Sequence, residues 1–511
     1  MLFSADFLAS MKLFEKYPVH LTNSLTSKKE LFSPVNAGRV GMYVCGPTVY
    51  NDVHLGNVRT FMMFDIVARY LRYVGYRVRY VRNITDVGHL ENDADEGEDK
   101  IAKKARLEQL EPMEVVKHYT EGFHHVMRQF NILPPSIEPS ATGHIVEQIE
   151  IVKKLIDGGL AYEVNGSVYF DVTKYNEHNN YGILSGRIVE ELMESGRKLD
   201  SQDEKRNKVD FALWKKASPY HIMRWPSPWG EGFPGWHIEC TVMSTKYLGE
   251  TFDIHGGGMD LKFPHHECEI AQAVGATGKQ PVNYWLHSNM LTVNGQKMSK
   301  SLGNSFLPRE LFAGNHALLE KGYSAMTVRF FMLQSHYSST LDFSNEALNA
   351  AEKGFKKLAN ALTAVKKLSH PGSSQPDPEL VQVLDRLHQE LYINMSDDFN
   401  SAKTLAVLFE MSARINDFKS GNVSLGAVDA ETFETFKKCY IGFMEDVLGL
   451  NEEAEHDEAL LTGVINVLIE LRKKARKDRN FALSDKIRDD LKSMGVQLMD
   501  GKDGEMSFSI D

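Results

Sequence analysis

The fold is decided by one stretch of the chain, Cys45-Gly46-Pro47-Thr48-Val49-Tyr50-Asn51-Asp52-Val53-His54-Leu55-Gly56-Asn57. It directly follows an apolar segment at residues 40–44 that predicts a buried strand, and it leads into helical apolar spacing at residues 59–74. Residues 76–84 then alternate as a second buried strand. This order predicts a βαβ unit, in which ligands bind at the carboxyl ends of the parallel strands. The Gly, Pro and His residues of the turn allow backbone N–H groups at the helix start to approach a phosphate closely.

A second motif, Lys297-Met298-Ser299-Lys300-Ser301, lies about half the chain further on. Its two lysines and two hydroxyls can follow charge as it develops on a triphosphate. Such a string taken by itself is more often a solvated loop, but the order of the two motifs resembles the ATP signatures of class I aminoacyl-tRNA synthetases. The resemblance implies an ATP site made of Pro47, Thr48, His54, Gly56, Asn57 and Lys300. It implies catalytic roles for His54, Asn57, Lys297 and Lys300.

Size and composition limit the classes of protein to consider. A chain of 511 residues, 42% hydrophobic and 25% charged, is too long for a single core and is typical of a multidomain globular protein. Its net charge of −11 argues against nucleic-acid binding by the whole surface, so any RNA must contact local basic faces. The sequence contains no apolar run of about 18 residues, and its four cysteines are too few for a disulfide scaffold. We therefore expect a cytoplasmic protein that does not cross a membrane.

The pattern along the chain predicts an α/β protein with several parts. Residues 1–132 and 209–290 are expected to form the two halves of a Rossmann-like parallel-sheet catalytic domain, with parallel strands resuming at Phe211. Residues 133–208 are expected to be an inserted α+β connective module, and residues 291–344 to contain the lysine-motif loop. A helical bundle is expected at residues 345–450, and a small C-terminal domain of two helices and a short hairpin around Asp500-Gly501 at residues 459–511. The resemblance implies that residues 291–344 also contact the tRNA stem, that the bundle binds tRNA, and that the C-terminal domain binds the anticodon.

A candidate metal site is built from separated residues. His265 and Glu269 lie four residues apart after Pro264, which suits a helix start, so both side chains are expected on one helix face. An imidazole and a carboxylate on one face make half of a zinc site, and cysteines must supply the remainder. Cys45, at the end of the first strand, and Cys240 are the candidates. Free cysteines are also commonly small buried apolar residues, and without a CxxC pair the spacing leaves both interpretations open.

Further motifs resemble the cysteinyl-tRNA synthetase family over nearly the whole chain from Lys12. They are residues 41–51, Ser227-Pro228-Trp229-Gly230, Gly235-Trp236-His237-Ile238-Glu239-Cys240, Phe252-Asp253-Ile254-His255-Gly256-Gly257-Gly258 and Phe263-Pro264-His265-His266-Glu267. The resemblance implies one zinc ion per chain, held by Cys45, Cys240, His265 and Glu269. It also implies contacts to the amino acid from Gly46, Thr85 and Trp236.

The resemblance implies a cysteine–tRNA ligase that uses ATP with Mg²⁺, L-cysteine and tRNA(Cys). We expect a monomer. A zinc ion suits this task because a small apolar difference in a pocket discriminates by only about 1–3 kcal/mol, whereas zinc binds a thiolate outright at about 2.3 Å. A run of six cations, Arg472, Lys473, Lys474, Arg476, Lys477 and Arg479, is either a solvated helix face or a contact to the tRNA backbone. Two alternatives are a related ligase that passes cysteine to an amino sugar and a non-catalytic RNA-binding paralogue.

Overall fold

The computed structural model describes residues 12–87, 100–108, 110–195, 204–219, 221–235, 237–299, 302–372, 375–451, 458–478, 480–493, 496–500 and 506–510. The chain divides into two compact units, Met1–Asn451 and Glu452–Asp511. No helix within the described ranges has the length and apolar character needed to cross a bilayer.

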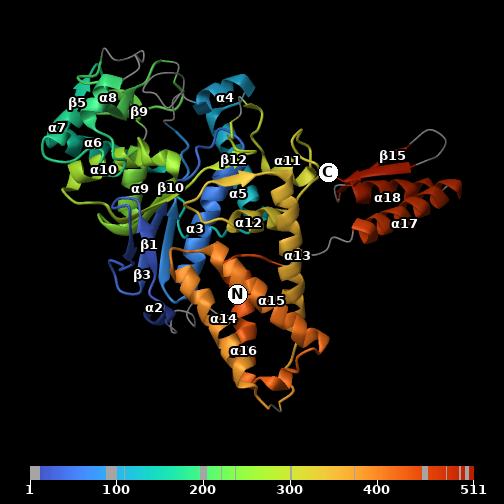
Figure 1. Ribbon diagram of the computed structural model, residues 1–511. Helices are drawn as coiled ribbons and strands as arrows, with labels where there is room; N and C mark the ends of the chain where they lie inside the picture. Colours follow the sequence, from blue (N-terminus) through green and yellow to red (C-terminus); the bar gives the residue numbers. More distant parts are fainter. Residues whose placement is uncertain are drawn as a thin grey trace. The chain divides into compact units, whose positions relative to one another are not determined.

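The first unit contains a four-stranded parallel sheet in the order β11-β10-β3-β4 (Figure 1). Its strands are β3 (Arg39–Val44), β4 (Arg77–Arg82), β10 (Phe252–Gly258) and β11 (Val282–Ser288). Helix α3 (Leu55–Tyr73) connects β3 to β4, and α10 (His265–Thr277) connects β10 to β11, while α9 (Ile238–Leu248) precedes β10. The predicted βαβ unit is confirmed. Because all four strands are parallel, Cys45 and the residues after β10 and β11 lie at the same edge of the sheet.

Helix α3 is buried on nearly all sides, since 15 of its 19 residues are buried. Three of these residues are charged, and two of the three meet an arginine from α12 (Ala325–Leu333): the Asp65 carboxylate accepts from Arg69 Nε at 2.8 Å and from Arg329 Nη2 at 2.6 Å. The two guanidinium groups also donate to backbone carbonyls, including those of Asn131 and Leu448. We call Asp65, Arg69 and Arg329 the Asp65 cluster. It ties α3 to the end of the helical bundle.

The inserted module is an antiparallel sheet in the order β5-β6-β7-β9-β8 with helices on it. Its strands are β5 (Ala161–Val164), β6 (Ser167–Phe170), β7 (Phe211–Lys216), β8 (Trp225–Ser227) and β9 (Gly230–Pro234), and its helices are α6 (Ile145–Asp157), α7 (Val172–Asn176) and α8 (Val189–Ser195). The sequence analysis assigned the strands from Phe211 onward to the parallel sheet, and this is wrong: β7 pairs with β6, so the module continues to Pro234. A short apolar strand has the same pattern in either kind of sheet, and only its pairing partner separates the two cases.

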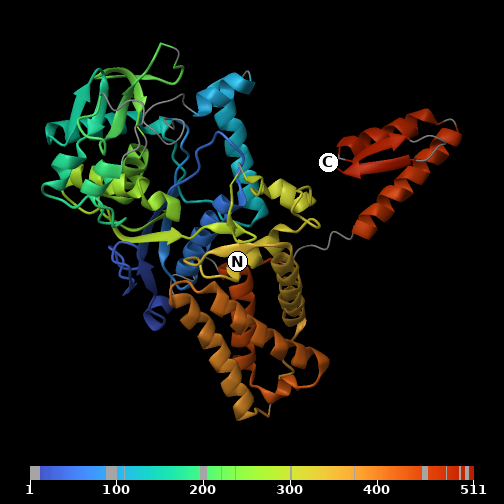
Figure 2. The same cartoon turned by 45° about the horizontal axis from the view of Figure 1, so that its top comes forward.

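The lysine motif begins within a small three-stranded sheet, β13-β12-β14. The strands are β12 (Leu291–Val293), β13 (Gln296–Lys297) and β14 (Leu341–Phe343), and α11 (Pro308–Ala313) follows the motif. The bundle comprises α13 (Asn345–Lys367), α14 (Pro378–Ser396), α15 (Ser401–Ser420), α16 (Ala430–Gly442) and a π-helical turn, η6 (Phe443–Val447). Figure 2 shows α14, α15 and α16 side by side, in agreement with their packing.

Further elements complete the first unit. They are α2 (Leu13–Lys16), the hairpin β1 (His20–Asn23) and β2 (Lys28–Leu31), α4 (Lys100–Glu108), α5 (Pro112–Gln129), and the short turns η2 (Thr142–His144), η3 (Met259–Lys262) and η5 (Leu425–Ala427).

The second unit consists of α17 (Glu458–Lys477), α18 (Phe481–Ser493) and an antiparallel hairpin of β15 (Val496–Asp500) and β16 (Met506–Ile510). Its small core includes Ile465, Ile469 and Leu491. The two helices and the hairpin near Asp500 agree with the sequence-based expectation.

Candidate active site and metal centre

Four candidate ligands meet at the carboxyl edge of the parallel sheet. Cys45 directly follows β3, Cys240 lies in the first turn of α9, and His265 and Glu269 lie one turn apart on α10. Their ligand atoms all lie within 4.8 Å of one another, and all four residues are buried. We call these four residues the Cys45 cluster. The structure thus brings together the set that the resemblance implied, from positions up to 224 residues apart in the chain.

The distances within the Cys45 cluster fit a single tetrahedral ion. Cys45 Sγ lies 3.7 Å from Cys240 Sγ, 3.4 Å from His265 Nε2 and 3.5 Å from Glu269 Oε1, and the last two atoms are 3.1 Å apart. In a regular tetrahedron the edge is about 1.6 times the metal–ligand bond, so zinc bonds of about 2.3 Å to sulfur and about 2.0–2.1 Å to nitrogen or oxygen give edges of roughly 3.3–3.8 Å. The donor set and its spacing therefore suit a zinc-sized cation.

Two further histidines orient these ligands. His255, in β10, lies with Nε2 2.8 Å from Glu269 Oε2, the carboxylate oxygen that faces away from the cluster. His237 Nδ1 lies 2.7 Å from His265 Nδ1, so the ring nitrogen of His265 that faces away from the cluster has a partner. Hydrogen bonds of this kind fix the tautomer and the direction of metal ligands. The sequence analysis quoted both histidines within motifs but gave neither a role.

A second row of histidines adjoins Cys45. His266 Nε2 lies 3.4 Å from Cys45 Sγ, and His266 Nδ1 lies 2.8 Å from His287 Nε2 at the end of β11. A second group of residues also has ligand atoms within 4.8 Å of one another: Cys45, His255, His266 and Glu269. This group shares Cys45 and Glu269 with the Cys45 cluster. Sequence spacing could not reveal it, because adjacent helix positions such as 265 and 266 are not expected to face the same point.

The electrostatics of the Cys45 cluster favour a thiolate and a carboxylate. Burial raises the pKa of the Cys45 thiol well above its usual range, and its hydrogen bond with Cys240 raises it further. Burial also opposes ionisation of Cys240, but the hydrogen bond from Cys45, together with the charge and hydrogen bond of His265, lowers the Cys240 pKa. Burial likewise opposes ionisation of Glu269, yet nearby His255 and His265 lower its pKa to about 2. A bound cation would displace the remaining protons and take over their role of balancing these anions.

The expected amino-acid contacts adjoin the Cys45 cluster. The Gly46 N–H donates to Asn83 Oδ1 at 2.8 Å, and Asn83 Nδ2 donates to Thr85 Oγ1 at 2.9 Å. A Cβ at Gly46 would lie 1.6 Å from the Asn83 carbonyl oxygen, so only glycine fits there. Asn83 also places Oδ1 3.8 Å from Cys240 Sγ, which links Gly46 and Thr85 to the cluster. Trp236, the third expected contact, lies outside the described residues.

The expected ATP residues shape the start of α3. His54 is the N-cap: its Nδ1 accepts from the Asn57 N–H at 3.3 Å, and Asn57 Oδ1 accepts from the His54 N–H at 3.3 Å. Gly56 lies between them in the first turn of the helix. Pro47 and Thr48 run beside Thr85, since the Thr85 N–H donates to the Pro47 carbonyl at 3.0 Å. The structure therefore gives His54 and Asn57 a capping role, which orients the helix N-terminus where phosphates are commonly bound.

Lys297 lies in β13, paired with Thr292, and its side chain is exposed. Lys300, the other predicted catalytic lysine, lies outside the described residues. The Met298 side chain extends to the nucleotide-binding turn, because a Cβ at Gly56 would lie 3.1 Å from Met298 Cε. The two motifs predicted to bind ATP are therefore in contact.

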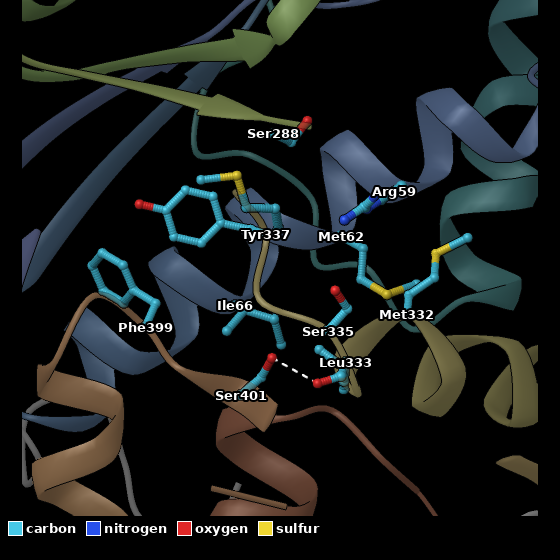
Figure 3. Close-up of a pocket in the computed structure, with 11 residues that line it drawn as sticks. Arg59, Met62, Ile66, Ser288, Met332, Leu333, Ser335, Tyr337, Phe399 and Ser401 are labelled. Atoms are coloured by element: carbon cyan, nitrogen blue, oxygen red, sulfur yellow. Dashed lines mark hydrogen bonds between the residues drawn. The ribbon is translucent and has the colours of Figure 1, made fainter. Parts of the chain in front are cut away.

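A separate cavity lies beside α3 (Figure 3). Arg59, Met62 and Ile66 line it from α3, with Met332 and Tyr337 from the segment after the lysine motif. None of its eleven lining residues is Cys, His, Asp or Glu. The cavity is therefore distinct from the metal-ligand residues.

Comparison with known proteins agrees with this geometry. A family model described as "tRNA synthetases class I (C) catalytic domain" matches residues 31–353, and one described as "DALR domain" matches residues 392–452. The chain is 54% identical to a cysteine–tRNA ligase of Bacteroides fragilis, covering 96% of this chain and 98% of that protein. It is 55% identical to the cysteine–tRNA ligase of Porphyromonas gingivalis, with 96% and 99% covered.

Solved structures agree at the level of fold. A methionyl-tRNA synthetase of Mycobacterium tuberculosis in complex with methionyl-adenylate matches with a TM-score of 0.58 at 14% identity, covering 80% of this chain and 91% of that one. A putative arginyl-tRNA synthetase of Campylobacter jejuni matches with a TM-score of 0.52 at 12% identity, covering 88% and 99%. Together with the family models and the relatives above, these matches show that the chain belongs to the class I aminoacyl-tRNA synthetases, in the family of cysteine–tRNA ligases.

Proposed function

We propose that this protein joins L-cysteine to the 3′ end of tRNA(Cys) in two ATP-dependent steps, and that the Cys45 cluster selects cysteine with one zinc ion per chain. The observation that carries the zinc proposal is the set of 3.1–3.7 Å distances among two thiols, an imidazole and a carboxylate, all buried. These distances are close to the edges of a zinc tetrahedron. We place this activity in the cytoplasm, in a monomeric enzyme.

Selection of cysteine over serine requires more than pocket shape. The two amino acids differ by one atom, and a difference of this size in an apolar pocket gives only about 10–200-fold discrimination. Bound zinc would supply a soft Lewis acid that holds a thiolate far more strongly than a hydroxyl. Around it, His237 and His255 hold the directions of His265 and Glu269. Burial of the cluster excludes water from the position of the substrate side chain.

Activation needs no nucleophile from the enzyme. The cysteine carboxylate attacks the α-phosphate of ATP, which is bound with Mg²⁺, and pyrophosphate leaves as cysteinyl-adenylate forms. Gly46, Thr85 and Trp236 position the amino acid, while Pro47, Thr48 and Gly56 leave room for the nucleotide. His54, Asn57, Lys297 and Lys300 stabilise the charge that develops on the phosphates. The terminal ribose hydroxyl of the tRNA then accepts the cysteinyl group and AMP leaves.

An exchange assay tests the proposal directly. Purified enzyme should catalyse ATP–pyrophosphate exchange that depends on L-cysteine, with serine at least about 10⁴-fold less effective, as translation demands. Metal analysis of the same preparation should find one zinc per chain. Equal exchange with serine, or full activity in metal-free protein, would refute the zinc proposal while leaving the ligase assignment intact.

The second unit is proposed to meet the tRNA. Of the six cations near residue 475, Arg472 is buried in this unit, Lys473 is half-buried, Lys474, Arg476 and Lys477 are exposed, and Arg479 lies outside the described residues. Three exposed cations on one helix end suit contact with phosphates. Truncation of the chain after Asn451 tests this role. The residues just before Asn451 must be kept, because Leu448 and Leu450 are buried and the Gly449 carbonyl accepts from Asn131 Nδ2 at 2.8 Å. Such a truncation should spare ATP–pyrophosphate exchange and lower aminoacylation of tRNA.

A further inference from the structure

A buried asparagine closes the loop that carries the lysine motif. Asn304 Oδ1 accepts from the Ser299 N–H at 2.8 Å, and Asn304 Nδ2 donates to the Lys297 carbonyl at 3.2 Å. The side chain is only 6% exposed. A single amide therefore satisfies one backbone donor and one backbone acceptor on the same side of the loop, in the way that a neighbouring strand would.

The base of this loop is fixed to the nucleotide-binding turn. Phe306, two residues after Asn304, is fully buried, and its carbonyl accepts from the N–H of Leu55, the first residue of α3, at 3.2 Å. At the N-terminal side of the loop, the Met298 side chain lies next to Gly56, which is in the same turn of α3 as Leu55. Asn304 thus lies between an anchored residue and the backbone of the lysine motif.

The two bonds constrain the backbone of Lys297 without touching its side chain. Lys297 ends the short strand β13, whose pairing with β12 stops at this residue. Within the described part of the loop, the Asn304 amide supplies side-chain hydrogen bonds to the backbone beyond that pairing, at residues 297 and 299. A lysine that stabilises charge at a phosphate is effective only if little reorganisation is needed when the charge appears.

We propose that Asn304 is a positioning residue for activation of the amino acid: it holds the backbone of the lysine motif so that Lys297 points at the phosphates of ATP. The inference rests on the proposed function of Lys297. It assigns Asn304 no contact with ATP or with the amino acid. Its loss therefore affects the rate of adenylate formation and leaves the binding of cysteine unchanged.

The first experiment compares Asn304→Ala with the wild type and with Leu302→Ala, a change at a 62% exposed side chain of the same loop. The kcat of cysteine-dependent ATP–pyrophosphate exchange should fall about 10–100-fold in Asn304→Ala, the scale of a misplacement of about 1 Å. The Kd of L-cysteine from equilibrium dialysis should stay within about twofold, and Leu302→Ala should keep the wild-type rate. Unchanged kcat in Asn304→Ala, or a parallel loss of cysteine binding, overturns the proposal.

A double-mutant cycle with Lys297→Ala identifies the route of the effect. If Asn304 acts through Lys297, Asn304→Ala should lower kcat much less in the Lys297→Ala background than in the wild type. Full additivity of the two losses overturns the proposal. If Asn304→Ala does not fold, Asn304→Asp replaces it in the same cycle, since it keeps an acceptor for the Ser299 N–H and loses the donor to the Lys297 carbonyl. A wild-type enzyme without cysteine-dependent exchange would instead refute the proposed function, so the two failures are distinguishable.

Discussion

Two buried charged clusters lie in the same unit of this protein, and they balance their charges differently. In the Asp65 cluster one carboxylate pairs with two guanidinium groups. The other N–H groups of these arginines donate to backbone carbonyls such as that of Phe130. In the Cys45 cluster two thiols and a carboxylate gather around histidines. The contacts described above join its four residues to one another, to the neighbouring His237, His255 and His266, and to Asn83.

We interpret this difference as that between a structural cluster and the proposed metal site. Burial acts to raise the pKa of Asp65, but Arg69 and Arg329 outweigh it and lower the pKa, so the carboxylate is ionised with its counterions already in place. In the Cys45 cluster the negative charges are balanced by protons on neighbouring side chains, such as His265. Burial opposes charge on His265, but the hydrogen bond and charge of Cys240 raise the His265 pKa well above its usual range. A cluster completed by its own chain holds elements together. One that needs an added cation is suited to bind a metal.

The largest expected effect tests the binding site. Cys240→Ser should reduce bound zinc from one per chain to a small fraction, and it should lower cysteine-dependent exchange by more than about 10²-fold, since even outer partners of metal ligands account for about 10–100-fold. Metal analysis and the exchange assay measure the two quantities. The matched control is Cys268→Ala, on α10 but outside the cluster, where Sγ contacts the Tyr181 hydroxyl at 3.4 Å. Loss of zinc in the control as well would contradict the ligand assignment.

The next effect tests the structural cluster. Asp65→Asn should lower the free energy of unfolding by about 3–5 kcal/mol, because it leaves two buried guanidinium groups without their counterion. Urea denaturation measures this change. Zinc content at low temperature in the folded variant should stay at one per chain. A stable variant that has lost its zinc would reverse the roles given to the two clusters.

A smaller effect is expected at the hydrogen bonds around the ligands. His255→Gln should weaken zinc binding about 10–100-fold, because it disturbs the bond that orients Glu269. Competition with a chelator of known affinity measures the change. His388→Gln, at a half-buried histidine of the bundle, provides the control and should leave zinc affinity unaltered. Identical affinity in both variants would show that Glu269 needs no orientation by His255.

The smallest effect is expected at an exposed ion pair. Lys279 Nζ lies 2.6 Å from Glu250 Oε2, but the side chains are 62% and 59% exposed. Water and salt screen such a pair, so Glu250→Gln should leave the Tm and the zinc content unchanged. A clear loss of stability would mean that burial is not what distinguishes the Asp65 cluster from ordinary surface pairs.

Local patterns predicted much of the secondary structure. The apolar segment before Cys45, the helical spacing after it and the alternation that follows gave the βαβ unit, because strand and helix periods are set by neighbouring residues. The same is true of the helices and hairpin of the second unit. The assignment of β7 to the parallel sheet failed because β7 pairs with β6, which lies about 40 residues earlier in the chain. Nothing in the sequence of β7 identifies this pairing partner.

The candidate site was only partly predictable. The i, i+4 spacing indicated His265 and Glu269, whereas the choice of Cys45 and Cys240 depended on resemblance to a family. His237, His255 and His266 were not predicted, since their partners come from other strands and helices. Asn304 was also missed, because a single polar residue after a motif gives no sequence signal until its hydrogen bonds are known.

The sequence by itself determined the kinds of elements, the two motifs predicted to bind ATP and the ligand types available for a metal. Tertiary structure alone decided which buried charges are balanced within the chain and which are not. Arg329 reaches Asp65 from 264 residues away, and Cys240 reaches Cys45 from 195 residues away. Whether a buried ionisable group forms part of a scaffold or of a binding site depends on the charges within a few ångströms of it, and only the folded chain sets those distances.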